Sequence, residues 1–166
     1  MNADGGSQQA GPTVDISIQS PLWNDHNSEA TVRRAIAAAA PRDTQDAELS
    51  VLLTDDAEIR TLNAQWRQQD KSTNVLSFPV PDTSSGQSRL LGDIVIAYET
   101  TAREAESEHK PFEHHLSHLT VHGFLHLLGY DHESDDEAET MERLEREILA
   151  RLDIADPYAT HDQGEG

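Results

Sequence analysis

Three histidines stand close together in the stretch VHGFLHLLGYDH, which covers residues 121–132. His122 and His126 are four residues apart, so in a helix their side chains lie on one face, about one turn apart. Gly129 is able to take the left-handed conformation that often ends a helix. A chain reversal at that glycine brings His132 back beneath the same face. The spacing therefore predicts three imidazoles around one metal ion.

The ligand set predicts which metal binds and in what role. Three imidazoles with an open fourth position are typical of catalytic zinc, whereas structural zinc is usually enclosed by four protein ligands. Imidazole donors favour Zn²⁺, one ion per chain, although the acidic surroundings would also accommodate Mn²⁺ or Ni²⁺. The alternative is a surface histidine stripe without a metal, because histidines recur every four residues at His114, His118, His122 and His126. For His114 and His118 we expect ordinary hydrogen-bonding or surface roles.

The spacing H-x-x-x-H-x-x-G-x-x-H matches the zinc signature of the metzincin peptidases, with one chemical difference. In those peptidases a glutamate follows the first histidine and acts as the general base. Here the residue after His122 is Gly123, which cannot accept a proton. A metzincin-like metallopeptidase is therefore an alternative that rests on spacing alone. Zinc by itself can bring the pKa of its bound water to about 7.

The rest of the chain predicts the elements that position these histidines. Alternating and short apolar runs predict four strands, at about residues 14–18, 49–53, 75–80 and 94–98. Apolar periodicity and capping residues predict a helix after Thr54 and further helices at about 29–40, 100–108, 112–128 and 135–152. The fold class is α+β: a single domain in which an about four-stranded mixed sheet packs with four to five helices, one of them a zincin-like metal helix.

Length and composition predict one cytoplasmic domain. The 166 residues contain no repeat and no second core, so we expect one domain over 13–157 between disordered tails at 1–12 and 158–166. The absence of cysteine excludes disulfides and thiolate metal sites and suits a reducing cytoplasm. No secretory signal is expected, and no apolar stretch approaches the roughly 20 residues of a membrane helix, so no membrane partner is expected.

The net charge constrains the partners. It is −19 for the whole chain, and residues 133–166 contribute −9 of this through 12 acidic residues against 3 arginines. Such a field repels nucleic acid at long range, so an RNA-directed function needs a local basic patch.

Four motifs resemble the YbeY family of bacterial endoribonucleases. They are HGFLHLLGYDH at 122–132, LNAQWRQQDKSTNVLSFP at 62–79, LGDIVIA at 91–97 and the acidic DDEAETMERLEREIL at 135–149. The resemblance implies a metal-dependent, single-strand-type endoribonuclease of the bacterial cytoplasm. It implies a role in ribosomal RNA maturation, notably at the 3′ end of the small-subunit RNA, and in ribosome quality control.

The resemblance also implies roles for individual residues. The metal-binding histidines map onto His122, His126 and His132, and a functionally important arginine maps onto Arg67. We expect Arg67 to hold a phosphate, since its planar fork suits a bidentate contact. The alternative for Arg67 is a surface salt bridge with Asp70.

Weaker expectations concern the neighbours of these residues. We expect Lys71, Ser72 and Thr73 to lie along the substrate. Asp131 either orients a ligand histidine or caps the reversed chain. Asp93 either caps a bend before its strand or faces the site.

The expected partners are ribosomal RNA, the small ribosomal subunit and ribosome-associated proteins that deliver RNA to an acidic enzyme. The acidic last helix is a candidate docking face for such a protein. A further alternative is a ribosome-assembly module in which the metal is only structural.

Overall fold

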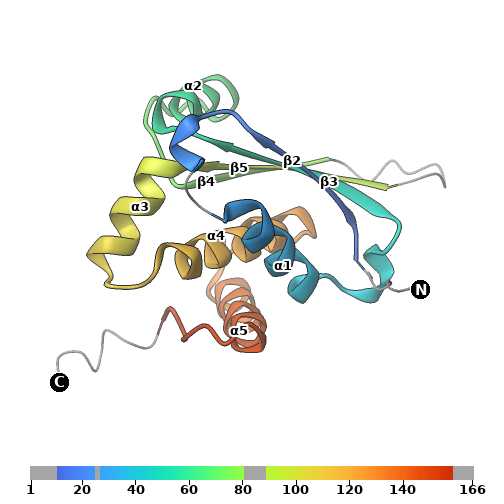
Figure 1. The fold of residues 1–166 in the computed structure, drawn as a ribbon. Coiled ribbons are helices and arrows are strands. Elements are labelled where there is room, and N and C mark those ends of the chain that lie inside the picture. The colour runs from blue at the N-terminus through green and yellow to red at the C-terminus, as the bar shows by residue number, and fades with distance from the viewer. Residues whose placement is uncertain (1–10, 25–26, 81–88, 159–166) are drawn as a thin grey trace, which may run out of the picture.

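The computed structural model describes residues 11–24, 27–80 and 89–158, and these form a four-stranded sheet with helices on both faces (Figure 1). The strand order is β2-β3-β5-β4. β2 pairs with β3, and β3 with β5, in parallel, whereas β4 is antiparallel to β5. The bounds are β2 (Thr13–Ile18), β3 (Ala47–Thr54), β4 (Val75–Pro79) and β5 (Arg89–Ala97). The mixed sheet and the α+β class are therefore confirmed.

β5 begins several residues earlier than the apolar run at 94–98 predicts. Gly92 makes this extension possible, because its φ of +141° is one that side chains rarely allow. A Cβ on Gly92 would also lie 2.3 Å from the carbonyl oxygen of Phe78 in β4. The sequence pattern missed this part of the strand because Gly92 interrupts it.

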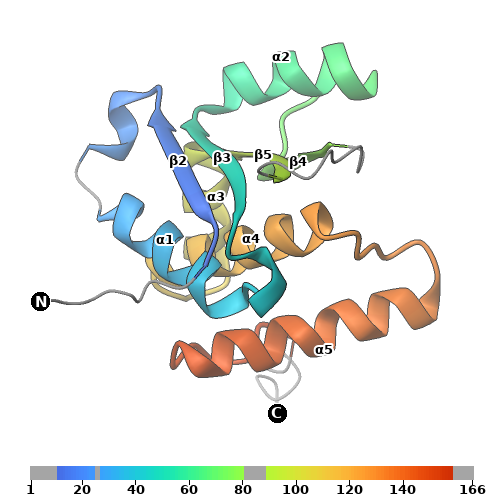
Figure 2. The same cartoon turned by 90° about the vertical axis from the view of Figure 1, so that its right-hand side faces the viewer.

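Five α-helices surround the sheet within the described residues. They are α1 (Ser28–Ala39), α2 (Asp56–Arg67), α3 (Tyr98–Ser107), α4 (Phe112–Leu127) and α5 (Asp135–Arg151), with short 3₁₀ turns η2 (Pro21–Trp23) and η3 (Arg42–Thr44). α1 and α4 lie against one face of the sheet and α2 lies across the other (Figures 1 and 2). α5 packs on α1 and α4, on their side away from the sheet. In the parts of the chain that the structure describes, no helix is long and apolar enough to cross a lipid bilayer.

The main core lies between the sheet and the helix pair α1 and α4. Side chains of β3 and β5 meet those of α4 there, and fully buried examples are Leu49, Leu53, Ile94, Ile96, Leu116 and Phe124. Burying each such side chain contributes roughly 1.5–3 kcal/mol relative to leaving it in water. Apolar contacts thus hold α4 on the sheet, and His122 and His126 lie in its C-terminal half.

Capping of α2 differs from the expectation. Its N-cap is Asp55, whose carboxylate accepts a hydrogen bond from the amide of Glu58 at 2.9 Å. Thr54, which we expected to cap this helix, is the last residue of β3, and its hydroxyl donates to the side-chain oxygen of Gln19. The shift arises because β3 runs one residue further than its apolar pattern indicates.

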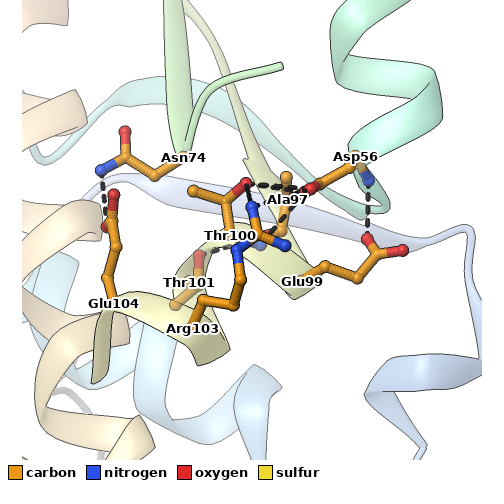
Figure 3. A network of polar contacts seen from close by, with 8 residues as sticks. All are labelled: Asp56, Asn74, Ala97, Glu99, Thr100, Thr101, Arg103 and Glu104. Carbon is orange, nitrogen blue, oxygen red and sulfur yellow. Dashed lines mark hydrogen bonds and ion pairs between the residues drawn. The ribbon is translucent and has the colours of Figure 1, made fainter. Parts of the chain in front are cut away.

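The first turns of α2 and α3 cap each other (Figure 3). The carboxylate of Asp56 accepts hydrogen bonds from the amide and hydroxyl of Thr100, at 3.1 and 2.9 Å. In return, Glu99 accepts from the amide of Asp56 at 2.7 Å. Arg103 adds an ion pair to Asp56 at 3.3 Å. This reciprocal capping fixes the position of α2, the helix that carries Arg67 at its other end.

The expected disordered tails lie almost wholly outside the described residues, which exclude 1–10 and 159–166. Tyr158 is described, and its hydroxyl donates a hydrogen bond to the buried carboxylate of Glu145.

Candidate metal centre

The last turn of α4 is followed by a backbone motif that reverses the chain. The amide of Gly129 donates to the carbonyl of His126 at 3.0 Å, and the amide of Tyr130 donates to the carbonyl of Leu125 at 3.0 Å. This pair of bonds is the Schellman motif, which places a left-handed residue after the helix. Gly129 supplies that residue with a φ of +107°. The reversal directs His132 back toward the helix end.

Three imidazoles converge at this reversal. The ring centroids of His122 and His126 lie 4.7 Å apart, those of His126 and His132 5.2 Å, and those of His122 and His132 5.9 Å. One ring nitrogen from each lies within 4.8 Å of the others, a spacing that one cation could bridge. The structure thus brings together the three residues that the spacing singled out. Their binding of a metal stays a prediction.

The hydrogen bonds of the cluster fit a metal site. Nδ1 of His126 lies 3.0 Å from the carbonyl oxygen of Tyr130, to which it can only donate. Nε2 is then the nitrogen that carries the free lone pair. Burial lowers the pKa of His126, and the neighbouring His122 and His132 lower it further. A ring kept neutral in this way is ready to bind a metal, because a protonated imidazole cannot.

A buried carboxylate from α5 stands behind the cluster, and sequence reasoning missed it. Glu145 has no exposed surface. Its Oε2 lies 2.6 Å from Nδ1 of His122, and its Oε1 lies 2.9 Å from Nε2 of His118. The hydroxyl of Tyr158 donates a further hydrogen bond to the same carboxylate. All three neighbours come from other segments of the chain.

The electrostatics of Glu145 follow from these contacts. Burial raises the pKa of its carboxyl, but hydrogen bonds from His118 and His122 outweigh burial and lower the pKa to about 2. Burial also raises the pKa of Tyr158, and the adjacent Glu145 raises it further. Glu145 is therefore a carboxylate and Tyr158 a neutral donor at physiological pH.

One signal in the sequence could have indicated Glu145. It falls on the buried face of α5, where its neighbours Met141, Ile148 and Leu149 are all apolar. An acidic residue on such a face is rarely buried without partners. His118, for which we expected an ordinary hydrogen bond, is one of those partners.

Arg67 reaches the same region from the end of α2. Its guanidinium donates to the carbonyl of Ser77 at 2.5 Å and stacks over Phe78 at 5.4 Å. The hydroxyl of Ser77 donates to the carbonyl of Gly123 at 3.3 Å, so β4 links Arg67 to α4. The alternative salt bridge with Asp70 is wrong, because Asp70 pairs with Arg60 at 2.8 Å.

A cavity of about 950 Å³ joins these groups. His122, His126 and His132 line it together with Arg67 and with residues of β4, α3 and the segment after α4. Two of the expected substrate neighbours, Lys71 and Thr73, also line it, but Ser72 does not. Among the described residues, neither Arg67 nor Lys71 forms an ion pair within the chain.

The structure places Asp131 and Asp93, the two aspartates for which we had expectations, in different regions. Asp131 lines the cavity, and its carboxylate accepts a hydrogen bond from the amide of the adjacent His132 at 2.8 Å. Both roles expected for Asp131 stay predictions. Asp93 lies inside β5, on the sheet face opposite α4, where it lines a second cavity beside Trp66. Neither expectation for Asp93 is met, since it does not precede the strand and does not face the histidines.

Comparisons with known proteins agree with the motifs. The family model described as Endoribonuclease YbeY matches residues 15–153. A protein of Bradyrhizobium sp. strain BTAi1 with that name is 58% identical over 161 residues, which cover 92% of this chain and 95% of the relative. One of Rhodopseudomonas palustris strain BisB18, also so named, is 58% identical over 160 residues, covering 92% of this chain and 95% of that one.

One solved structure also aligns with this chain. The solution structure of a Thermotoga maritima protein aligns with a TM-score of 0.48 at 26% identity, covering 88% of this chain and 99% of that one. The family match spans nearly the whole described chain, from β2 to the end of α5. Because the family model matches most of the chain and the two relatives are 58% identical to it, the chain belongs to the YbeY family.

Proposed function

We propose that this protein is a metal-dependent endoribonuclease that cleaves single-stranded stretches of ribosomal RNA in the bacterial cytoplasm. Its role would be maturation of the 3′ end of the small-subunit RNA and ribosome quality control. The relatives named Endoribonuclease YbeY support the reaction class. The observation that carries the proposal is that one cavity is lined by a three-histidine cluster and by Arg67, which has no ion-pair partner among the described residues.

The histidines would hold the metal, one ion per chain, with Zn²⁺ favoured by the imidazole donors. When bound, such an ion supplies Lewis acidity and lowers the pKa of a coordinated water to about 7. The chain contributes the rings of His122 and His126, each with its Nδ1 engaged by an acceptor. His132, on the exposed rim, completes the set.

Arg67 would bind the scissile phosphate. Its contact with Ser77 uses one terminal nitrogen, so further N–H donors remain for a phosphate oxygen. The guanidinium would also offset negative charge that develops in the transition state. Because Ser77 and Phe78 hold it, this donor is positioned before the substrate arrives.

Lys71 and Thr73 would extend the contact along the RNA chain. The side-chain amide of Asn63 donates to the carbonyl of Lys71 at 3.0 Å, which fixes the loop between α2 and β4 beside the cavity. Few cations face the substrate, however, and the chain as a whole carries a net charge of −19. Non-specific affinity for RNA should therefore be weak, and delivery by the ribosome or by a ribosome-associated protein would compensate.

A cleavage experiment tests the proposal. Protein purified without chelators or a histidine tag is analysed for metal and then incubated with a single-stranded RNA, a duplex RNA and casein. We expect cleavage of the single-stranded RNA alone, and its loss in His126→Ala and in Arg67→Ala. Proteolysis with intact RNA would contradict the proposed reaction class.

The cellular role needs a second measurement. In a strain that lacks the gene, the wild-type chain should restore normal 3′ ends of the small-subunit RNA, whereas Arg67→Ala and His126→Ala should not. Normal 3′ ends with both variants would instead favour an assembly role without catalysis.

A further inference from the structure

The strongest unexplained feature of the structure is the carboxylate of Glu145, which is fully buried although it is neither a proposed metal ligand nor a proposed contact of the substrate. It belongs to α5, a helix that contributes none of the three clustered histidines. α5 runs along the side of α4 that faces away from the sheet (Figure 2). From there Glu145 reaches two histidines of α4, at 2.6 Å for His122 and 2.9 Å for His118.

Burying this group carries a free-energy cost that an apolar side chain would avoid. A buried carboxylate is tolerated when several donors satisfy its oxygens, and removing one partner of such a set is strongly destabilising. Glu145 has donors on both oxygens: His122 on Oε2, and His118 and Tyr158 on Oε1. The neighbouring buried residues Met141 and Ile148 indicate that an apolar residue would also pack at this place.

The contact with His122 fixes the tautomer of that ring. A carboxylate can only accept, so Nδ1 of His122 must carry the proton. Nε2 is then left with the lone pair that a metal needs. His126 reaches the same tautomer through a backbone carbonyl, that of Tyr130. For His122 the acceptor is a side chain, so it can be altered by mutation without changing the backbone.

We propose that Glu145 is a positioning residue for the metal centre: it holds the His122 ring in the orientation and tautomer that present Nε2 to the cation. Tyr158 and His118 complete the shell that keeps this carboxylate in place. Residues that orient metal-binding histidines in this way typically contribute a factor of about 10–100 in metal affinity. The inference rests on the proposed function, because it needs His122 to be a ligand.

Tyr158 ties the end of the described chain to the same carboxylate. Its ring packs edge-on against His118, with centroids 5.7 Å apart, and its hydroxyl donates to Oε1 of Glu145. Removal of the hydroxyl alone should therefore loosen the carboxylate without removing it. This gives a graded test in which the packing of the ring is preserved.

The experiment measures Zn²⁺ affinity by competition with a chromophoric chelator. Glu145→Met removes both acceptor oxygens at similar volume and should weaken binding by about 10–100-fold. Glu145→Gln keeps one acceptor oxygen but loses the charge, and Tyr158→Phe loses one donor, so both should give smaller losses. The matched control is Glu147→Met, the same change at an exposed position of α5, which should bind like the wild type.

A second readout does not depend on metal or activity. Long-range ¹H–¹⁵N correlation spectra of the wild-type protein without metal identify the tautomer of each histidine ring. We expect the Nδ1–H form for His122 in the wild type and a shift toward the Nε2–H form in Glu145→Met. A merely structural Glu145 would change stability and leave this signature unaltered.

The outcomes separate this proposal from the proposed function. If the wild type and His126→Ala bind Zn²⁺ equally, the metal function fails, and the role of Glu145 fails with it. If the wild type binds more tightly than His126→Ala, but Glu145→Met matches the wild type, only the role of Glu145 is overturned. Should Glu145→Met fail to fold, an unchanged Zn²⁺ affinity in Glu145→Gln would overturn the role of Glu145. An Nε2–H tautomer of His122 in the wild type would also overturn that role.

Discussion

Gly123 of α4 lies directly against Ile94 of β5. A Cβ built on Gly123 would be 3.0 Å from Cγ2 of Ile94 and 3.2 Å from Oγ of Ser77. Real Cβ contacts are seldom this short, so the helix sits on the sheet at a distance that only glycine allows without movement of its neighbours. The position at which a metzincin carries its glutamate is therefore buried here against the sheet.

This contact predicts the effect of restoring the peptidase signature. Gly123→Glu should lower the free energy of unfolding and should yield no peptidase activity, because the new side chain would start inside a packed interface. Gly123→Ala should cost less. The helix propensity of alanine contributes about 1 kcal/mol, but forcing a methyl group into the interface costs about 1–3 kcal/mol. Urea unfolding and a casein assay measure both effects.

A compensating variant serves as the control for Gly123→Ala. Ile94→Ala removes the nearest atoms, so the double variant should be more stable than the sum of the two single effects predicts. Strictly additive changes in unfolding free energy, or a stabilised Gly123→Ala protein, would mean that the interface accommodates the added methyl group without strain.

The metal ligands predict a second result. Alanine at His122, His126 or His132 should in each case remove most of the bound metal, since two imidazoles hold an ion far less well than three. His114→Ala should leave the metal content unchanged, because His114 lies beside another cavity and outside the cluster. Metal analysis of the four purified variants decides this, and equal metal in all four would refute the ligand assignment.

Variants of Arg67 should separate the effect of its positive charge on RNA cleavage from the effect of its planar shape. Arg67→Ala should reduce kcat for RNA cleavage by about 10²–10³-fold, in line with the loss of one preorganised donor at a transition state. Arg67→Lys should recover only part of this, because lysine keeps the charge but not the planar fork. Zn²⁺ affinity should stay at the wild-type value in both. A lysine variant with full activity would indicate that only long-range charge matters.

His115 predicts a pH dependence of stability. Burial lowers its pKa below the usual 6.5, against the raising effect of its partner Glu104 at 2.8 Å. Lys110 lowers the pKa further, whereas Glu108 raises it. As the pH falls, the unfolded chain therefore binds this proton first. The contribution of His115 to the free energy of unfolding is fully present above about pH 6.5. It is lost as the pH falls toward the pKa of His115 in the folded protein.

The measurement is urea unfolding of metal-free protein from about pH 8 to pH 5, the range in which histidine titrates. His115→Gln can still donate to Glu104 but cannot titrate, so its stability should fall less steeply over this range. Parallel curves for the wild type and the variant would show that His115 takes no part in the acid sensitivity.

The reciprocal caps of α2 and α3 predict a coupling energy. Asp56→Ala and Glu99→Ala should each lower the unfolding free energy by about 1 kcal/mol, the usual cost of a lost cap. Each side chain bonds the other helix, so the two effects should be non-additive in a double-mutant cycle. Glu58→Ala, which alters the same first turn of α2 but leaves its amide bonded to Asp55, is the matched control. Additive losses would mean that the two caps act independently.

The features that the sequence determined by itself depend on residues that are close together along the chain. His122 and His126 of α4 and the glycine-dependent reversal that returns His132 all lie within eleven residues of chain, 122–132. Over so short a distance, helix geometry and the conformational freedom of glycine leave few arrangements, so spacing alone predicts the cluster. The strands and helices were predictable for the same reason, because each depends on the period of its own residues.

What only the tertiary structure decided is which distant side chains meet. Glu145 reaches His122 across 23 residues of sequence, and Asp56 reaches Thr100 across 44. Asp70 had an arginine nearer in sequence, Arg67, yet it pairs with Arg60 because the chain leaves α2 through a left-handed residue. Such contacts follow from how helices pack on the sheet, and packing sums many weak interactions that no single stretch of sequence encodes.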